Sequence, residues 1–301
     1  MQKYDVLGIG TTAVDIVYLL NGYPVLGMKK RAIDFSIQGG GLIGTSLVTL
    51  ARLGAKVAYA GKLGEDYFSK FLVDEFRREN VDVFLEIDKD FSPVIAVVLV
   101  DKSTGERTIV WREQSSPIEL EDIDLKLIGR TKIIHLDCVS LKLEDATEVA
   151  KKARDENVKV SLDVEVLKPK MDDLLKLVNF LIVPQQFSYS LTGEKDVKKA
   201  CRKMMSRYEN DLVCITMGER GCYCSTPDES FYQPAFKVKV VDTTGCGDVF
   251  HGAFLYGVIN NWNPRKIARF ASAAAALKCR KLGGRAGIPT LSEVESFLRN
   301  L

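Results

Sequence analysis

The stretch Val240-Val-Asp-Thr-Thr-Gly-Cys-Gly-Asp-Val-Phe-His-Gly-Ala-Phe254 joins apolar residues to a helical pattern through a glycine-rich turn. The residues that lead into it, Val238 to Val241, predict the end of a strand, and the apolar residues after Asp248 recur at helical spacing. Thr243 or Thr244 would be the N-cap of this helix. A Gly-Cys-Gly turn at a helix start exposes backbone N–H groups, and the helix dipole adds partial positive charge there. The stretch therefore predicts an anion-binding turn.

Asp248 lies inside this turn, next to the expected anion. A carboxylate is a poor ligand for phosphate, so its presence needs a chemical reason, and we favour a general base. It would take a proton from a hydroxyl group that attacks a phosphoryl group. The backbone amides of Gly245, Cys246 and Gly247 would hold that phosphoryl group. The alternative is a glycine-rich loop followed by an ordinary acidic residue at a helix start.

The sequence Asp242-Thr-Thr-Gly-Cys-Gly-Asp248 resembles the signature D-T-x-G-A-G-D of the ribokinase-like (PfkB) sugar kinases. The one departure is Cys246 in place of Ala, and we expect it to matter little because only the backbone amide acts there. The resemblance covers nearly the whole chain. It implies an α/β fold, with a doubly wound, mostly parallel sheet flanked by helices and a small β-sheet lid. It also implies ATP and Mg²⁺ as cofactors.

The composition is that of an ordinary globular protein, with 46% hydrophobic and 27% charged residues. A net charge of +2 gives no reason to expect a nucleic-acid partner. No run of about 18 apolar residues predicts a membrane span, and the N-terminus lacks a signal-peptide core. The seven cysteines lie mostly in apolar runs, as reduced and buried residues do. We therefore expect a cytoplasmic protein with a small-molecule substrate.

The first strand is expected at Tyr4 to Gly10, and Gly8-Ile-Gly-Thr-Thr-Ala13 after it matches the dinucleotide fingerprint G-x-G-x-x-A. That fingerprint requires a helix next. Val14 to Leu20 is instead rich in β-branched and aromatic residues and predicts a strand, so a dehydrogenase is excluded. In the resemblance, Asp15 of this strand binds sugar hydroxyls. Its alternative interpretation is an exposed strand residue.

A second glycine turn, Gly39-Gly-Gly-Leu-Ile-Gly-Thr-Ser46, leads into a helix expected at 42–53. Thr45 stands where a P-loop carries lysine, which excludes a P-loop. The turn looks like the family motif G-G-x-x-x-N, with Gly40 and Gly41 as the glycine pair. Thr45 then replaces the sugar-binding asparagine. A hydroxyl remains but the amide is lost, which leaves the identity of the sugar open.

Two segments predict a small sheet apart from the main one. Strands are expected at 14–20 and 29–38, and residues 93–112 alternate as a hairpin around a glycine turn. The resemblance implies that this sheet is a lid that closes over the sugar and excludes water. It also allows a homodimer formed through the lid. We expect the lid at 13–38 and 93–112, and a main nucleotide- and sugar-binding domain at 1–12, 39–92 and 113–301.

From residue 131 onward, strands and helices alternate, which is typical of a doubly wound α/β sheet. Strands are expected near 132–136, 158–163, 180–183 and 212–216, and helices near 143–156, 170–178 and 194–207. The resemblance assigns the nucleotide to this half, since Thr216-Met-Gly-Glu-Arg-Gly221 matches T-x-G-x-x-G. Its nucleotide-binding residues are Thr216, Gly218 and Gly221, and Ser272 aligns with a position near the adenine. A plain hairpin turn is the alternative for residues 216–221.

Two metal sites also follow from the resemblance. Asp242 and Thr244, with carbonyl groups of the loop 281–289, would hold a monovalent cation, for which potassium is the candidate. Many family members carry N-x-x-E, whose glutamate acts near the magnesium ion. Here Ser188 takes the place of that glutamate, and Asp163, at the end of a predicted strand, is the candidate to compensate.

We therefore expect an ATP-dependent kinase that phosphorylates a hydroxyl, expected to be primary, of a sugar or sugar derivative. The two histidines, His135 and His251, receive no catalytic role. Two alternatives stay open. One is a nucleoside kinase on the same fold, which a substrate panel would distinguish. The other is a sugar-binding regulator without catalysis, which the missing glutamate favours and Asp248 opposes.

Overall fold

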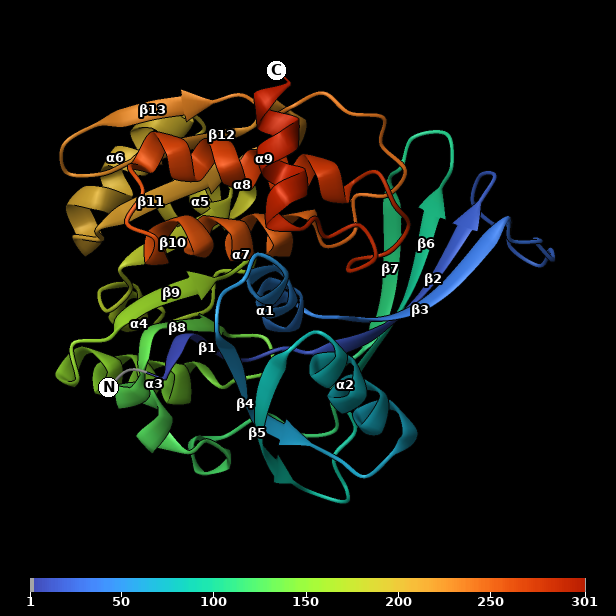
Figure 1. Cartoon of the computed structure of the whole chain (residues 1–301), viewed down its shortest axis with the longest axis horizontal. Helices are drawn as coiled ribbons and strands as arrows, with labels where there is room; N and C mark the ends of the chain where they lie inside the picture. The colour runs from blue at the N-terminus through green and yellow to red at the C-terminus, as the bar shows by residue number, and fades with distance from the viewer. Residues whose placement is uncertain (1–2, 301) are drawn as a thin grey trace.

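The computed structural model describes residues 3–300, and their strands form two separate sheets (Figure 1). The larger sheet has the order β13-β12-β11-β10-β9-β8-β1-β4-β5. Its strands run parallel from β11 to β5, whereas β12 and β13 add an antiparallel edge. The strands are β1 (Tyr4–Ile9), β4 (Val57–Leu63), β5 (Val81–Ile87), β8 (Thr131–Asp137), β9 (Lys159–Asp163), β10 (Phe180–Pro184), β11 (Leu212–Thr216), β12 (Cys222–Ser225) and β13 (Ser230–Gln233).

Both faces of this sheet are apolar and covered by helices. Neighbouring strand residues point to opposite faces, so that Val6 and Leu7 enter different cores. One core includes α1 (Leu42–Arg52), α7 (Cys246–Ile259), α8 (Pro264–Lys278) and α9 (Leu291–Arg299). The other includes α3 (Leu143–Asp155), α4 (Asp172–Leu175), α5 (Gln185–Thr192) and α6 (Val197–Tyr208). Short 3₁₀ turns lie at η1 (Leu120–Asp122), η2 (Leu125–Arg130) and η3 (Gly218–Arg220), and none of the described helices has the length and apolar character that crossing a bilayer requires.

The strand order reverses at β1, which lies between β4 and β8. In open α/β sheets such a reversal leaves a crevice at the carboxyl ends of the strands, where ligands bind. Two polar residues meet at this point. Thr11, just after β1, donates its amide hydrogen to Asp137, the last residue of β8, over 2.6 Å. The reversal therefore predicts a binding site above β1 and β8.

The smaller sheet stands beside the large one in the order β3-β2-β6-β7 (Figure 1). Its strands are β2 (Ala13–Leu20), β3 (Asp34–Gly40), β6 (Val94–Asp101) and β7 (Arg107–Arg112). Side chains alternate between buried and half-buried along β6, as in a sheet with one covered face. Helix α2 (Tyr67–Arg78) packs near β2 and β3 and links the two sheets.

Two of the expected strands differ from the structure. The strand expected at 29–38 begins only at Asp34, because β2 ends at Leu20 and the pairing ends where the Ile33 amide donates to the Leu19 carbonyl (2.8 Å). The apolar residues 238–241 form no strand. The Val241 amide donates to the Cys279 carbonyl after α8 (2.8 Å) instead of pairing with a neighbouring strand.

The helices also differ in three places. The helix expected at 170–178 is reduced to α4, since Lys170 adopts a left-handed conformation (φ 63°) just before it. Helix α5 was not expected. Helix α7 begins after Gly245 rather than at a threonine N-cap, because the Thr244 hydroxyl is bonded to Asp242 and makes no cap.

Candidate active site

The turn before α7 has free backbone amides at its centre. Gly245 adopts the left-handed conformation (φ 72°, ψ 5°), which glycine reaches without strain. Among residues 3–300, the amides of Gly245, Gly247 and Asp248 have no acceptor, whereas the Cys246 amide donates to the Thr243 carbonyl (3.3 Å). Of the three amides assigned to the anion, two are thus free and one is engaged. Free amides at a helix N-terminus form an anion-binding site.

Asp248 occupies the first turn of α7, within this group of amides. Its main-chain carbonyl accepts a hydrogen bond from the Ser46 hydroxyl (2.9 Å), which ties α7 to α1. Desolvation raises the pKa of the Asp248 carboxyl to about 8, and the negative charge of Glu165 adds to this rise. A general base is most effective when its pKa is close to the operating pH. The position and the pKa of Asp248 therefore suit proton transfer near neutral pH.

Asp15 of β2 faces the same region from the small sheet and is 7% exposed. Burial raises the pKa of its carboxyl to about 6, and the positive charge of Arg285 opposes the rise. A Cβ atom on Gly40 would lie 2.3 Å from Asp15 Oδ2, so only glycine fits at position 40. The charge of Asp15 also raises the pKa of Asp248, which shows that the two carboxyl groups share one electrostatic environment.

Two residues that the sequence did not single out, Gln38 and Arg285, hold this framework together. Gln38 Oε1 accepts hydrogen bonds from the amides of Arg285 and Ala286 (3.0 Å each). The buried Arg285 guanidinium donates to the Gly40 carbonyl (2.8 Å) and pairs with Glu75 of α2 (3.1 Å). The loop 281–289 was considered only for its carbonyl groups, and no periodicity marks an arginine that acts through buried contacts.

The start of α1 brings the remaining expected sugar residues to the site. Gly41 is the N-cap with φ 83°, and a Cβ atom there would lie 2.6 Å from the Thr11 carbonyl. Thr45 is buried, and its hydroxyl has no hydrogen-bond partner in the described chain. The hydroxyl of Thr12, a residue that the sequence did not assign, is also buried and without a partner there. Buried hydroxyl groups without partners are available to a polar ligand.

The small sheet touches the catalytic turn through its hairpin. The Thr243 amide donates to the Gly105 carbonyl (3.3 Å), and Arg107 Nη1 lies 3.2 Å from Thr243 Oγ1. Arg107 is otherwise exposed, and its positive charge lowers the pKa of Asp248 against the larger effect of desolvation. The hairpin therefore brings a positive charge to the turn that would bind an anion.

The expected nucleotide residues gather at the antiparallel edge of the large sheet. Thr216 ends β11, and Gly218 and Gly221 lie in the turn between β11 and β12, with left-handed φ values at Gly218 (59°) and Gly221 (96°). A Cβ atom on Gly221 would lie 2.1 Å from the Gln233 carbonyl, so packing alone requires that glycine. Ser272 is buried in α8, which packs against β12 and β13.

Carboxyl groups without matching positive charge lie at the ends of β8 and β9. Asp137 and Asp163 are register partners there. Burial raises the pKa of Asp163 well above its usual value, and the negative charges of Asp248 and Glu165 add to the rise. A divalent cation would relieve this excess of negative charge, so the residues present fit Mg²⁺.

For this ion, the Glu165 carboxylate is a more suitable ligand than the Ser188 hydroxyl group. Ser188 is buried in α5, and its hydroxyl donates to the Gln185 carbonyl (2.8 Å). Glu165 is exposed, two residues after β9, and raises the pKa of both Asp163 and Asp248. The sequence did not single out Glu165, because a charged residue after a strand is common. Glu165 becomes a candidate ligand only in the folded structure, where the end of β9 lies beside α7.

The two histidines pack beside this cluster. His251 Nε2 lies 3.5 Å from Asp163 Oδ1, and the ring centroids of His135 and His251 are 5.6 Å apart. Burial lowers the pKa of His135 to about 4 and also lowers that of His251. Both rings are therefore neutral near pH 7. Neither is given a catalytic role.

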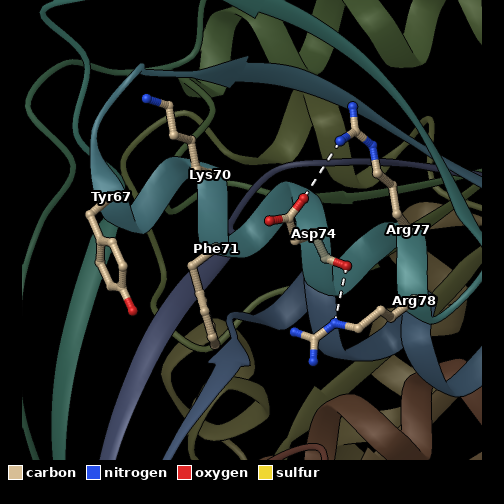
Figure 2. A pocket seen from close by; sticks show the side chains of 6 residues that line it. All are labelled: Tyr67, Lys70, Phe71, Asp74, Arg77 and Arg78. Carbon is tan, nitrogen blue, oxygen red and sulfur yellow. Dashed lines mark hydrogen bonds and ion pairs between the residues drawn. The ribbon is translucent and has the colours of Figure 1, made fainter.

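The outer face of α2 carries a shallow hollow that is separate from this site. Figure 2 shows the side chains that line it: Tyr67, Lys70, Phe71, Asp74, Arg77 and Arg78. Arg77 pairs with Asp74 over 3.5 Å, and both side chains are about two thirds exposed. Exposed ion pairs of this kind contribute little. None of the unpartnered buried polar groups of the described chain belongs to these six residues, so we assign the hollow no function.

Comparisons with known proteins agree with this geometry. Residues 4–291 match the family described as "pfkB family carbohydrate kinase". A ribokinase of Haemophilus influenzae is 29% identical over 97% of this chain and 97% of its own length. A 5-dehydro-2-deoxygluconokinase of Clostridium botulinum is 25% identical over 99% of this chain and 94% of its own.

The fold agrees as well. The crystal structure of a ribokinase from Thermotoga maritima superposes with a TM-score of 0.86 at 26% identity, covering 99% of this chain and 100% of that one. The family match spans both sheets, the turn before α7 and the glycine turn before α1. From its sequence and its fold, the chain belongs to the pfkB family of carbohydrate kinases.

Proposed function

We propose that this sugar kinase transfers the γ-phosphoryl group of ATP to a primary hydroxyl group of a sugar or sugar derivative, with Asp248 as the general base. The observation that carries the proposal is the placement of Asp248 among free amides at the start of α7, with a pKa of about 8. A base and an anion-binding turn at one helix end suit phosphoryl transfer to an alcohol.

The proposed step is balanced within the site. The sugar oxygen forms a bond to the γ-phosphorus, and its proton passes to the Asp248 carboxylate. The bond from the γ-phosphorus to the bridging oxygen breaks, and ADP leaves. The amides of Gly245 and Gly247 hold the phosphoryl oxygens, and Arg107 adds positive charge from the small sheet. The Cys246 amide would join them only if its bond to Thr243 opened.

The sugar would bind between the two sheets. Asp15 would accept hydrogen bonds from two sugar hydroxyls, and Thr45 would offer its free hydroxyl. Gly40 and Gly41 would leave room for the ring. Arg285 bonds to the Gly40 carbonyl next to Asp15, and Gln38 bonds to the backbone of Arg285, so that both support this side of the site. A charged acceptor with an unpartnered hydroxyl group as its neighbour in the site suits a polyhydroxy ligand.

The nucleotide would lie along the edge of β11, with Thr216, Gly218 and Gly221 near the phosphates and ribose and Ser272 near the adenine. Kinases of this family use ATP with Mg²⁺. Glu165 would hold the hydrated ion together with the phosphates, and the Asp163 carboxylate would add negative charge near it. When bound, the ion neutralises the charge that develops on the phosphates.

The small sheet would serve as a lid and as a dimer surface, with the boundaries 13–38 and 93–112. Large apolar side chains are exposed on it, including Phe35 (49%), Val110 (65%) and Trp111 (52%). Such a surface is typical of protein interfaces, so we infer that two copies pair through their lids. Sedimentation velocity tests this inference. A monomer at micromolar concentration would contradict it, as would a dimer that Trp111→Glu leaves intact.

A substrate screen tests the proposed reaction. ADP formation would be followed with ketohexoses, aldohexoses, inositols, sugar acids and nucleosides, each with the wild type and with Asp248→Asn. We expect turnover of a sugar or sugar derivative that depends on Asp248. Turnover of nucleosides alone would point to a nucleoside kinase. Binding of a sugar without ADP formation would indicate a regulator and contradict the proposal.

A further inference from the structure

Lys278, the last residue of α8, has a completely buried side chain (0% exposed). Its Nζ atom donates a hydrogen bond to the main-chain carbonyl of Asp242, over 3.0 Å, just before the anion-binding turn. No carboxylate of residues 3–300 forms an ion pair with it within 4.0 Å. A buried charge without a close ion pair is costly, so a position of this kind needs a function.

The main chain and the side chain of Lys278 are both enclosed. Lys278 is the last residue of α8, where the helix dipole favours a basic residue. The loop after α8 packs on its main chain, since a Cβ atom on Gly287 would lie 2.2 Å from the Lys278 carbonyl. The positive charge of Lys278 also lowers the pKa of Asp15 and of Cys246, in each case alongside stronger influences. Its charge therefore acts on both the sugar side and the anion side of the site.

A potassium ion held by Asp242 and Thr244 does not fit this arrangement. Asp242 Oδ1 accepts hydrogen bonds from the amide (2.8 Å) and the hydroxyl (2.7 Å) of Thr244, and Oδ2 accepts one from the Gly283 amide (2.6 Å). The main-chain oxygen of Asp242 is taken by Lys278. All three oxygens of Asp242 are thus engaged, and the Lys278 ammonium group already lies next to its main-chain oxygen.

We propose that the Lys278 ammonium group acts as a tethered monovalent cation, so that this kinase needs no potassium. Lys278 is a positioning residue. It holds the Asp242 backbone, and Asp242 joins the anion-binding turn to the loop 281–289 through Thr244 and Gly283. This role rests on the proposed function, because the turn is assumed to bind the transferred phosphoryl group.

The experiment compares KCl with tetramethylammonium chloride at equal ionic strength, after desalting. The wild type should show the same kcat and the same melting temperature in both salts. Lys278→Met keeps the bulk and removes the charge. It should lower kcat by at least about tenfold in either salt, because loss of a direct anion-hole donor costs roughly 10²–10³ and Lys278 acts one step further away.

The Lys278→Ala variant gives the most direct test, because the smaller side chain opens space beside Asp242 for an ion. Its kcat and its melting temperature should both rise in KCl relative to tetramethylammonium chloride, because binding to the folded state stabilises it. Lys281→Met, an exposed lysine in the next loop, is the matched control and should behave as the wild type.

A wild type that is activated several-fold by potassium would overturn the proposal, as would full activity of Lys278→Met. Failure of the proposed function would look different. The wild type would then phosphorylate no sugar in either salt, while the melting temperatures would still report whether Lys278→Ala gains a potassium response.

Discussion

The two sheets differ sharply in how much of each is buried. In the large sheet every residue of β4 is buried, and helices cover both faces. In the small sheet every residue of β7 is exposed, and one small buried cluster is formed by Val17, Ala96, Val98 and Val100. Since burial of apolar area is what resists local opening, the large sheet should be rigid and the small sheet mobile.

The groups of the site are divided between these two regions. Asp248 and the free amides belong to α7, which packs on the large sheet, whereas Asp15 and Arg107 belong to the small sheet. The two regions meet where the Gly105 carbonyl accepts the Thr243 amide hydrogen. Under the proposed function, the chemical step would take place on the rigid part, and the mobile part would recognise the substrate. The following predictions test that division.

The largest effect is expected on the rigid side. Asp248→Asn should lower kcat by roughly 10²–10⁴-fold, because the general base is removed while the fold of α7 is retained. The KM values for sugar and ATP should change far less. Steady-state kinetics gives both quantities, with Asp196→Asn at the N-cap of α6 as control. A variant that keeps more than a tenth of the wild-type kcat would show that Asp248 is not the base.

A smaller effect, of a different kind, is expected on the mobile side. Asp15→Asn should raise the sugar KM roughly 10- to 100-fold, since a hydrogen bond to a charged group is worth about 1.5–3 kcal/mol. The pKa of Asp15 is about 6, so the wild-type KM should also rise as the pH falls below that value and the carboxylate gains a proton.

The Asn variant should lack this pH dependence, because its side chain does not titrate. Asp34→Asn, an exposed residue of β3 on the same sheet, should match the wild type at every pH. An unchanged KM in Asp15→Asn would remove Asp15 from the sugar site.

An effect of about tenfold is expected at the proposed magnesium site, which lies after β9 of the large sheet. Glu165→Gln should weaken the apparent affinity for Mg²⁺ by about that factor, as loss of outer contacts to a metal does. Ser188→Ala should leave it unchanged, since that hydroxyl is engaged inside α5. Calorimetric titration of Mg²⁺ into enzyme with ATP measures the affinity directly. The reverse pattern would place the ion beside α5.

The smallest effect concerns motion. Amide hydrogen exchange in β6 and β7 should slow modestly when sugar and a non-hydrolysable ATP analogue bind, because the sheet closes over them. Amides of β1 and β4 should not respond. Equal protection of both sheets, with binding verified separately, would argue against a mobile lid.

The sequence predicted what depends on local pattern. The apolar runs predicted β1 and β8 to β11 of the parallel strands, whereas β5 was not expected. The anion-binding turn around Gly245 and the role of its acid were predicted from the signature. The resemblance to sugar kinases was confirmed by the family match and the fold. The roles of the individual site residues and the domain boundaries stay predictions.

The rest depends on contacts between distant segments. Gln38 and Arg285 are more than two hundred residues apart in the sequence, and the residues around each of them carry no pattern that predicts their contact. The apolar run 238–241 resembles a strand but has no partner strand, since Cys279 accepts its hydrogen bond. From the sequence alone, Lys278 would be expected to be a solvated residue at a helix end. In the structure it is buried, and the following loop packs on its main chain.

The interior place of β1 has a consequence for how the chain folds. Tyr4 pairs with Thr131 in β8, so more than a hundred further residues must be synthesised after β1 before both its edges are covered. Contacts of such high sequence separation slow folding and leave strand edges exposed in the meantime. Until β8 is synthesised, the edge of β1 that will pair with it stays unpaired, and chaperones or prompt synthesis would protect that edge from aggregation.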